Sequence, residues 1–152
     1  MENDLESLAP AVTIGITTYN RPEMLREAIH SVLNQTYGNF EILIGNDYID
    51  TPVTFETLGI DPDPRVKIFN FSTNKGEIRN MNYLLELSDT EWFVWMADDD
   101  LFHQSFLESA LNSIQSGSDV VAVYSEYTFG TQVKEEFFFN IESVEVTNLI
   151  SS

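Results

Sequence analysis

Strand-like and helix-like segments alternate along most of this chain, and the alternation limits the folds that it can adopt. Runs of β-branched and aromatic residues predict strands over residues 11–17, 40–45, 66–71, 92–96 and 119–127. Helices are predicted between them, one from Pro22 to Gly38, one opening at Asn74 and one over residues 104–115. Such alternation predicts right-handed crossovers and a mainly parallel sheet with helices on both faces. We therefore expect an α/β domain.

Two of the predicted helices carry an apolar stripe that should face the sheet, because apolar residues recur at every third or fourth position. The first stripe consists of Leu25, Ala28, Ile29, Val32 and Leu33, and the second of Ile78, Met81, Leu84 and Leu85.

The size and the composition indicate one folded domain. The chain has 152 residues, of which 43% are hydrophobic, and it contains no cysteine, which excludes disulfides and thiolate metal sites. Residues 11–128 are expected to form the core, residues 1–10 an N-terminal tail, and residues 129–152 a second tail that could form an edge hairpin. The sequence shows neither an apolar run of the about 18 residues that a membrane span needs nor the pattern of a signal peptide, so the cytoplasm is the expected location.

The charge balance constrains the partners of this domain. Seven basic against 25 acidic residues give a formal net charge of −18. Such a surface repels nucleic acids and anionic lipids, so neither is expected as a partner. An anionic ligand would need a local cation, either one of the few Lys and Arg side chains or a metal ion held by carboxylates.

Three consecutive carboxylates, Asp98 to Asp100, follow the run Trp92–Met96, whose five large apolar residues predict a strand buried on both faces. Ligands of open α/β sheets bind beyond the carboxyl ends of the strands, where this triplet should lie. Two interpretations stay open: a solvated turn that caps the next helix, or a divalent-metal site. The net charge favours the metal site.

Polar residues gather in four predicted strand-end loops, over residues 17–21, 46–47, 74–76 and 98–100. Because the carboxyl ends of parallel strands meet at one edge of a sheet, these loops can line a single cleft. The chain lacks a Gly-x-Gly-x-x-Gly fingerprint, a P-loop and a Gly-x-Ser-x-Gly elbow, which disfavours hydride transfer, ATP hydrolysis and serine hydrolysis.

The motifs in these loops resemble those of family 2 glycosyltransferases. The resemblance covers about residues 11–128 and is carried, in order, by IGITTYNR (14–21), SVLNQTY (31–37), EILIGND (41–47), NKG (74–76) and the cluster at Asp98. It implies a GT-A fold with a Rossmann-like sheet, and transfer of a sugar from a nucleotide-diphosphate donor, often with Mg²⁺ or Mn²⁺. UDP is the default nucleotide, and the acceptor is a hydroxyl of an unknown glycan or other molecule.

The resemblance also implies roles for individual residues. The backbone of Thr17, Thr18 and Tyr19, together with Asp47, should hold the nucleobase, and Asp98 should contact the ribose. Asp99 should hold the metal ion, and Asp100 is a second candidate ligand. The remaining candidates for nucleotide contacts are Asn20, Arg21, Asn74, Gly76 and Arg79.

The chain departs from the family pattern at three places. Asn46 stands where members often have an acid, and Met81 stands where an Arg is common, with Arg79 as a substitute phosphate contact. Nothing after Gly130 resembles the second half of these enzymes, which supplies the general base, so the base is not identified. Three hypotheses follow: an active transferase, completed by a missing C-terminal half or by a partner such as a second copy; a non-catalytic donor-binding module; or an interaction domain.

Overall fold

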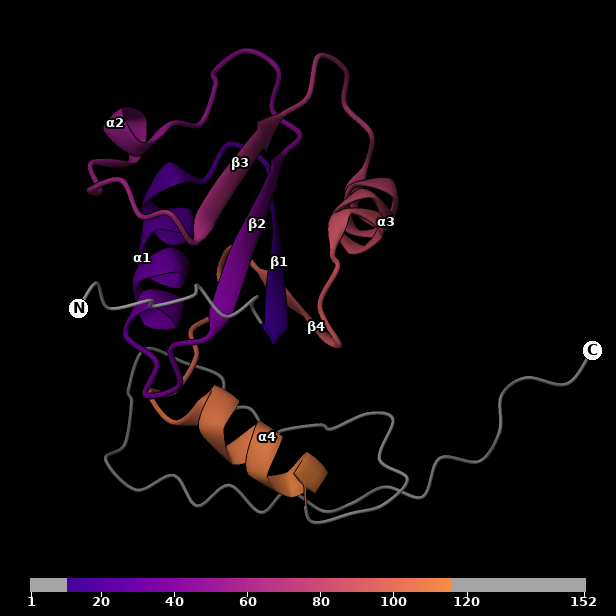
Figure 1. Ribbon diagram of the computed structural model, residues 1–152. Coiled ribbons are helices and arrows are strands. Elements are labelled where there is room, and N and C mark those ends of the chain that lie inside the picture. Colours follow the sequence, from indigo (N-terminus) through magenta and orange to yellow (C-terminus); the bar gives the residue numbers. More distant parts are fainter. Residues whose placement is uncertain (1–10, 116–152) are drawn as a thin grey trace, which may run out of the picture. The chain divides into compact units, whose positions relative to one another are not determined.

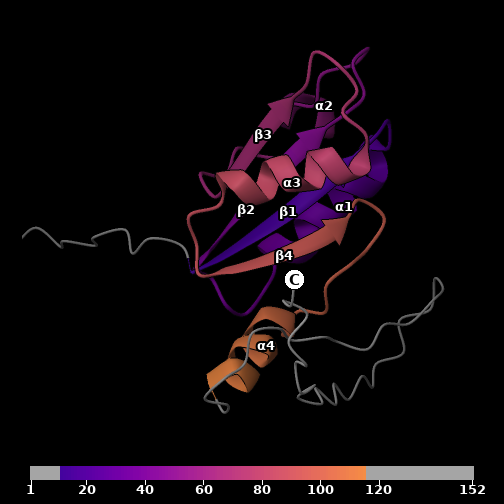
Figure 2. The ribbon, with the colours of Figure 1, turned by 90° about the vertical axis from the view of Figure 1, so that its right-hand side faces the viewer.

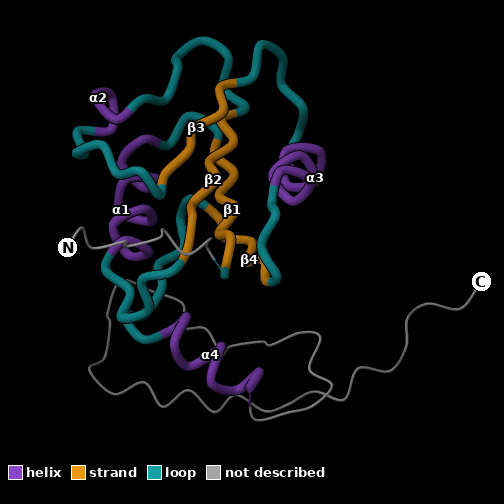
Figure 3. The backbone as a smooth tube through the Cα atoms, viewed as in Figure 1, coloured by secondary structure: helices purple, strands orange, loops and turns teal. Residues whose placement is uncertain are grey.

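The computed structural model of the protein describes residues 11–115, and in this part strands and helices alternate (Figures 1 and 3). The strands are β1 (Val12–Thr18), β2 (Phe40–Asn46), β3 (Val66–Asn70) and β4 (Trp92–Ala97). The helices are α1 (Pro22–Leu33), α2 (Phe55–Leu58), α3 (Glu77–Leu87) and α4 (Phe106–Gln115). The predicted strand over residues 119–127 and the hairpin over residues 129–152 lie outside the described residues.

The four strands form one sheet in the order β3-β2-β1-β4, and every pairing among them is parallel. Figure 1 shows α1 and α3 on opposite sides of this sheet, and Figure 2 shows α3 lying across β1 and β2. The expected α/β fold with helices on both faces is thus confirmed. Because the strands are parallel, their carboxyl ends come together at one edge.

The face of the sheet next to α1 is purely apolar at its centre. Strands alternate their side chains between the two faces, so Ile14 and Ile16 of β1 share a face with Ile42 and Ile44 of β2, and all four are fully buried. The predicted apolar stripe of α1 is buried as expected, at Leu25, Ala28, Ile29 and Val32. Burial of such side chains contributes about 1.5–3 kcal/mol each, which fixes α1 on this face.

The opposite face is held to α3 by one close polar contact. The Asn80 side chain on α3 is buried, and its Nδ2 donates a hydrogen bond of 2.9 Å to the carbonyl oxygen of Gly45 in β2. A Cβ atom at position 45 would overlap the Asn80 carboxamide oxygen. Glycine at this position therefore lets the helix approach the strand closely.

Two sequence expectations about these elements are wrong. Strand β4 is not buried on both faces, because β1 is its only strand neighbour among the described residues, and Trp95 is 50% exposed. The stripe predicted for α3 is buried only in part: Leu84 is fully buried, but Ile78 and Leu85 are 74% and 43% exposed. The polar Asn80 shares the buried side with Leu84. The short helix α2 was not predicted from the sequence.

Helix α1 ends at Leu33. The expectation that it would continue to Gly38 is therefore also wrong. The Gln35 side chain explains the early end, because its Nε2 donates to the carbonyl oxygens of Ser31 and His103, at 3.1 and 2.7 Å. The amide thus takes over a carbonyl of the last helical turn, which a further turn of helix would otherwise satisfy.

The described residues fall into two units, residues 11–104 and a second unit that begins at Ser105. Within the second unit, α4 confirms the helix expected over residues 104–115. None of the helices in residues 11–115 has both the length and the apolar character needed to cross a membrane.

The contact between Gly45 and Asn80 gives a test of this packing. We expect Gly45→Ala to lower the free energy of unfolding by about 1–3 kcal/mol, because the added methyl group forces α3 away from β2. Urea unfolding followed by circular dichroism measures the change. Gly38→Ala is the matched control, since a Cβ at position 38 meets no atom within 4 Å. Equal stability of the two variants would contradict the close packing of α3.

Candidate functional site

Thr18, the last residue of β1, joins the ends of two neighbouring strands. Its carbonyl oxygen accepts a hydrogen bond of 3.0 Å from the backbone N–H of Asp47, directly after β2. Its hydroxyl donates a hydrogen bond of 2.7 Å to Oδ2 of Asp98, directly after β4. Thr18, Asp47 and Asp98 are all buried, with exposed fractions of about 5%. The loops after β1, β2 and β4 therefore meet at one point, as the sequence predicted.

The turn after β1 carries Arg21 to the acidic cluster. Asn20 adopts a left-handed backbone conformation with φ of 56°, which asparagine tolerates better than most residues, and Pro22 opens α1. Arg21 lies between them at the N-cap position of the helix. Its Nη1 donates hydrogen bonds of 3.1 Å to Oδ1 of Asp98 and to Oδ2 of Asp99.

The three aspartates of the cluster differ in their surroundings. Asp98 is buried and both of its oxygens accept hydrogen bonds, from Thr18 and from Arg21. Asp99 is half-exposed, and Asp100 is exposed with its backbone N–H donating to the carbonyl oxygen of Ala97. Within residues 11–115, no group of three His, Cys, Asp or Glu side chains is arranged to hold a metal ion by itself.

Asn46 fixes the loop that follows β2. Its Nδ2 donates to the carbonyl oxygens of Tyr48 and Thr51 and to Oδ1 of Asn70, and its Oδ1 accepts from the Tyr48 N–H. Asn70, its register partner in β3, in turn makes two hydrogen bonds to the backbone of Val53. From the sequence, Asn46 was expected in a strand-end loop that lines the cleft and at a position where family members often have an acid, but its hydrogen bonds across this loop were not predicted. Asn46 and Asn70 lie at the paired ends of two adjacent strands, and this pair of amides could have indicated the hydrogen bonds between the two loops.

Asp47 joins this edge to the loop before α3. Its Oδ1 accepts a hydrogen bond of 2.7 Å from the backbone N–H of Lys75. The side chain of Asn74 accepts from the N–H of Gly76, which has φ of 78° and forms the N-cap of α3. The buried Asp47 carboxylate therefore fixes the backbone at Lys75, the residue before the N-cap of α3.

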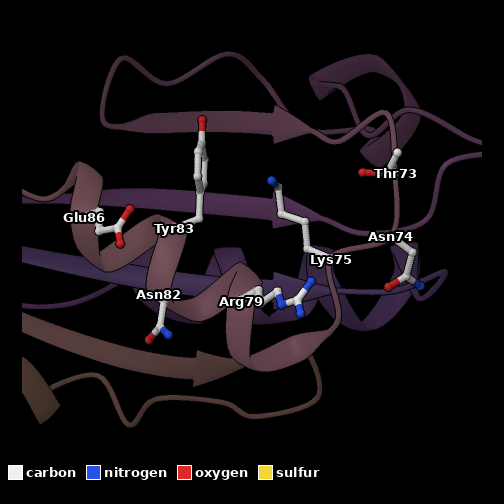
Figure 4. A pocket seen from close by; sticks show the side chains of 7 residues that line it. All are labelled: Thr73, Asn74, Lys75, Arg79, Asn82, Tyr83 and Glu86. Atoms are coloured by element: carbon white, nitrogen blue, oxygen red, sulfur yellow. The ribbon is translucent and has the colours of Figure 1, made fainter.

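A hollow of about 440 Å³ lies beside the first turns of α3 (Figure 4). Its walls include Asn74, Lys75, Arg79 and Tyr83. The Lys75 ammonium lies 4.8 Å from the ring centroid of Phe71 and 5.2 Å from that of Tyr83, contacts typical of a cation over aromatic faces. Lys75 and Arg79 form no ion pair with the described residues.

The structure brings five of the predicted site residues into one connected set. Thr18, Arg21, Asp47, Asp98 and Asp99 are linked by direct contacts. Tyr19 is 54% exposed, and its ring meets that of Tyr48 edge to face at 5.3 Å. Thr17 pairs with β2 and β4 inside the sheet. Asn74, Gly76 and Arg79 lie around the start of α3. The loop that holds them is connected to the set by the hydrogen bond from the Lys75 N–H to Asp47.

Solved structures with the same fold include nucleotide-sugar enzymes. The Staphylococcus aureus protein TarS, residues 1–349 in complex with UDP-GlcNAc, aligns with a TM-score of 0.60 over 69% of this chain and 31% of that one, at 20% identity. The mannosyltransferase PcManGT from Pyrobaculum calidifontis, in complex with GDP-Man and Mn²⁺, aligns with a TM-score of 0.53 over 62% of this chain and 29% of that one, at 19% identity. These similarities confirm the GT-A fold.

Relatives at higher identity are named as uncharacterised glycosyltransferases. A protein of Rickettsia typhi is 32% identical over 133 residues, which cover 86% of this chain and 41% of the relative. A protein of Haemophilus influenzae is 32% identical over 130 residues, which cover 82% of this chain and 52% of the relative. The chain thus spans about half or less of the length of these relatives. The model of glycosyl transferase family 2 matches residues 13–138, and the chain belongs to this family.

Proposed function

We propose that this domain binds the nucleotide diphosphate of an activated sugar and forms the donor half of a glycosyltransferase that acts on a hydroxyl acceptor. The observation that carries the proposal is the connected set of Thr18, Asp47, Asp98 and Arg21 at the carboxyl edge of a parallel sheet. Open α/β sheets bind ligands at this edge. Sugar transfer follows from the family, whose relatives carry glycosyltransferase names.

The nucleobase would lie against the loops after β1 and β2. Asp47 is held in place by its backbone N–H and by the Lys75 N–H, so its orientation is fixed before a ligand arrives. A carboxylate accepts hydrogen bonds only, which suits the N–H group of a uracil or guanine ring. The backbone of Thr17 to Tyr19 would complete this part of the site, with UDP as the default nucleotide. Asp98 would contact the ribose.

The carboxylates after β4 suit a Mg²⁺ or Mn²⁺ ion that shares its coordination with the donor. Oδ1 of Asp98 and Oδ2 of Asp99 already converge on one cationic group, the Arg21 guanidinium. Hard divalent cations take oxygen ligands, and Mg²⁺ is commonly held by one or two carboxylates together with substrate phosphates. Asp99 would be the principal ligand, and Asp100 would be close enough in sequence to add a second. When bound, such an ion neutralises the diphosphate as a leaving group.

The remaining steps of the transfer would involve residues of the chain and the acceptor hydroxyl. The N-terminal amides of α3 and the cations of Lys75 and Arg79 would stabilise the negative charge of the departing diphosphate. The acceptor hydroxyl would attack the anomeric carbon in line with the departing oxygen, which inverts the configuration at that carbon. A general base has to take the hydroxyl proton, and none is assigned among the described residues.

Calorimetric titration with UDP and GDP, with and without Mn²⁺, tests the donor site. We expect one nucleotide to bind more tightly with Mn²⁺, and Asp99→Asn to raise its Kd in the presence of metal by at least about tenfold, because a ligand oxygen loses its charge. Asp89→Asn is the matched control, since Asp89 is an exposed carboxylate that follows α3 at the other end of the sheet. If neither nucleotide bound to folded protein, the donor site would be wrong.

Asp47 offers a second test, which separates its role in folding from its role in binding. Asp47→Asn keeps an acceptor for the Lys75 N–H but loses the charge, so we expect near wild-type stability and a nucleotide Kd raised by about tenfold or more. Asp47→Ala should lower the free energy of unfolding as well, by about 1–2 kcal/mol. Urea unfolding and calorimetry measure the two effects. An Asn variant that binds nucleotide like the wild type would remove Asp47 from nucleobase recognition.

A further inference from the structure

A single nitrogen of Arg21 bridges the two carboxylates that the proposed function gives to ribose and metal. Nη1 lies 3.1 Å from Oδ1 of Asp98 and 3.1 Å from Oδ2 of Asp99. The other oxygen of Asp98 is already bonded to the Thr18 hydroxyl. The guanidinium therefore lies between the two carboxylates and contacts one oxygen of each.

Local backbone structure brings Arg21 to this place. The left-handed turn at Asn20 and the start of α1 at Pro22 set the direction in which residue 21 leaves the backbone. The Arg21 side chain remains half-exposed, at 51%. It can therefore leave the carboxylates for solvent without any rearrangement of buried groups, whereas Asp98 stays fixed through Thr18.

We propose, on the basis of the donor site described above, that Arg21 and a divalent cation compete for Asp98 and Asp99. In the donor-free protein the single positive charge of the guanidinium offsets half of the negative charge of the two carboxylates and reduces the repulsion between them. A cation that Asp99 binds beside Asp98 has to displace Nη1 from Asp99, since two positive groups repel each other at such short range. The displaced guanidinium, at the N-terminus of α1, is then free to contact the donor phosphates. Arg21 is thus a positioning residue that weakens metal binding until the donor is present.

The direction in which cation affinity changes when Arg21 is removed distinguishes competition from a supporting role. If Arg21 competes, its removal leaves two adjacent carboxylates without a counter-charge, and the affinity for a free cation rises. If Arg21 only holds the carboxylates in a binding geometry, its removal lowers that affinity. The ion pair of Arg21 with Asp99 is half-exposed on both sides and therefore weak, so the expected gain is modest, roughly three- to tenfold in Kd.

The experiment measures Mn²⁺ binding to the whole chain without nucleotide, by electron paramagnetic resonance of the free ion. Arg21→Gln is compared with wild type and with Arg26→Gln. Arg26 is exposed on α1 and forms no ion pair with the described residues, so its variant loses the same charge away from the cluster. We expect Arg21→Gln to bind Mn²⁺ roughly three- to tenfold more tightly than Arg26→Gln, and Asp99→Asn in the Arg21→Gln background to abolish the gain.

Each other outcome overturns the proposal. Equal affinity of the two Arg variants would mean that the guanidinium does not compete, and weaker binding by Arg21→Gln would make Arg21 a support for the metal site. Absence of Mn²⁺ binding in the folded Arg21→Gln variant would also reject competition. None of these results decides whether nucleotide binds, because UDP and GDP titrations of the wild type answer that question separately.

Discussion

The hydrogen bonds of Thr18 hold the functional edge of this domain together. Strand β1 is central in the described sheet, and its last residue bonds both to the loop after β2 and to the acidic loop after β4. Asp98 is buried, and the Thr18 hydroxyl and the Arg21 guanidinium satisfy its charge. Without such partners a buried carboxylate would be costly. The geometry of the whole edge therefore depends on a few short polar contacts.

The scarcity of positive charge gives these contacts their importance. The chain has 7 basic residues against 25 acidic ones, and three of the basic residues, Arg21, Lys75 and Arg79, lie at the carboxyl edge of the sheet or at the start of α3. Two of the remaining cations, Arg65 and Lys67, form ion pairs with Asp63 and Glu41. Three described cations form no ion pair with the described residues: Lys75 and Arg79 line the hollow beside the start of α3, and Arg26 lies on α1. The two beside α3 are consistent with a diphosphate there, because an anionic ligand of a strongly acidic protein needs a local positive charge.

The sequence predicted the parts of the structure that depend on periodicity and on strand ends. The alternation of strands and helices apart from α2, the parallel sheet and the meeting of Thr18, Asp47 and Asp98 are confirmed. The failure at α3 shows tertiary packing overriding a local pattern. Asn80 is buried because the small Gly45 lies opposite, so the helix turns its apolar stripe at Ile78 and Leu85 away from the sheet. Such contacts join residues that are far apart in the chain, so the pattern of one segment cannot predict them.

The close packing of Gly45 and Asn80 also constrains how the sequence of this domain can change over time. A side chain at position 45 and an amide at position 80 would occupy the same space, so neither position can vary freely while the other is retained. Substitutions at the two sites should show epistasis, with a larger residue in β2 tolerated only beside a smaller one in α3. The helix that presents Arg79, and that begins just after Lys75, thus owes its placement to a pair of residues that must evolve together.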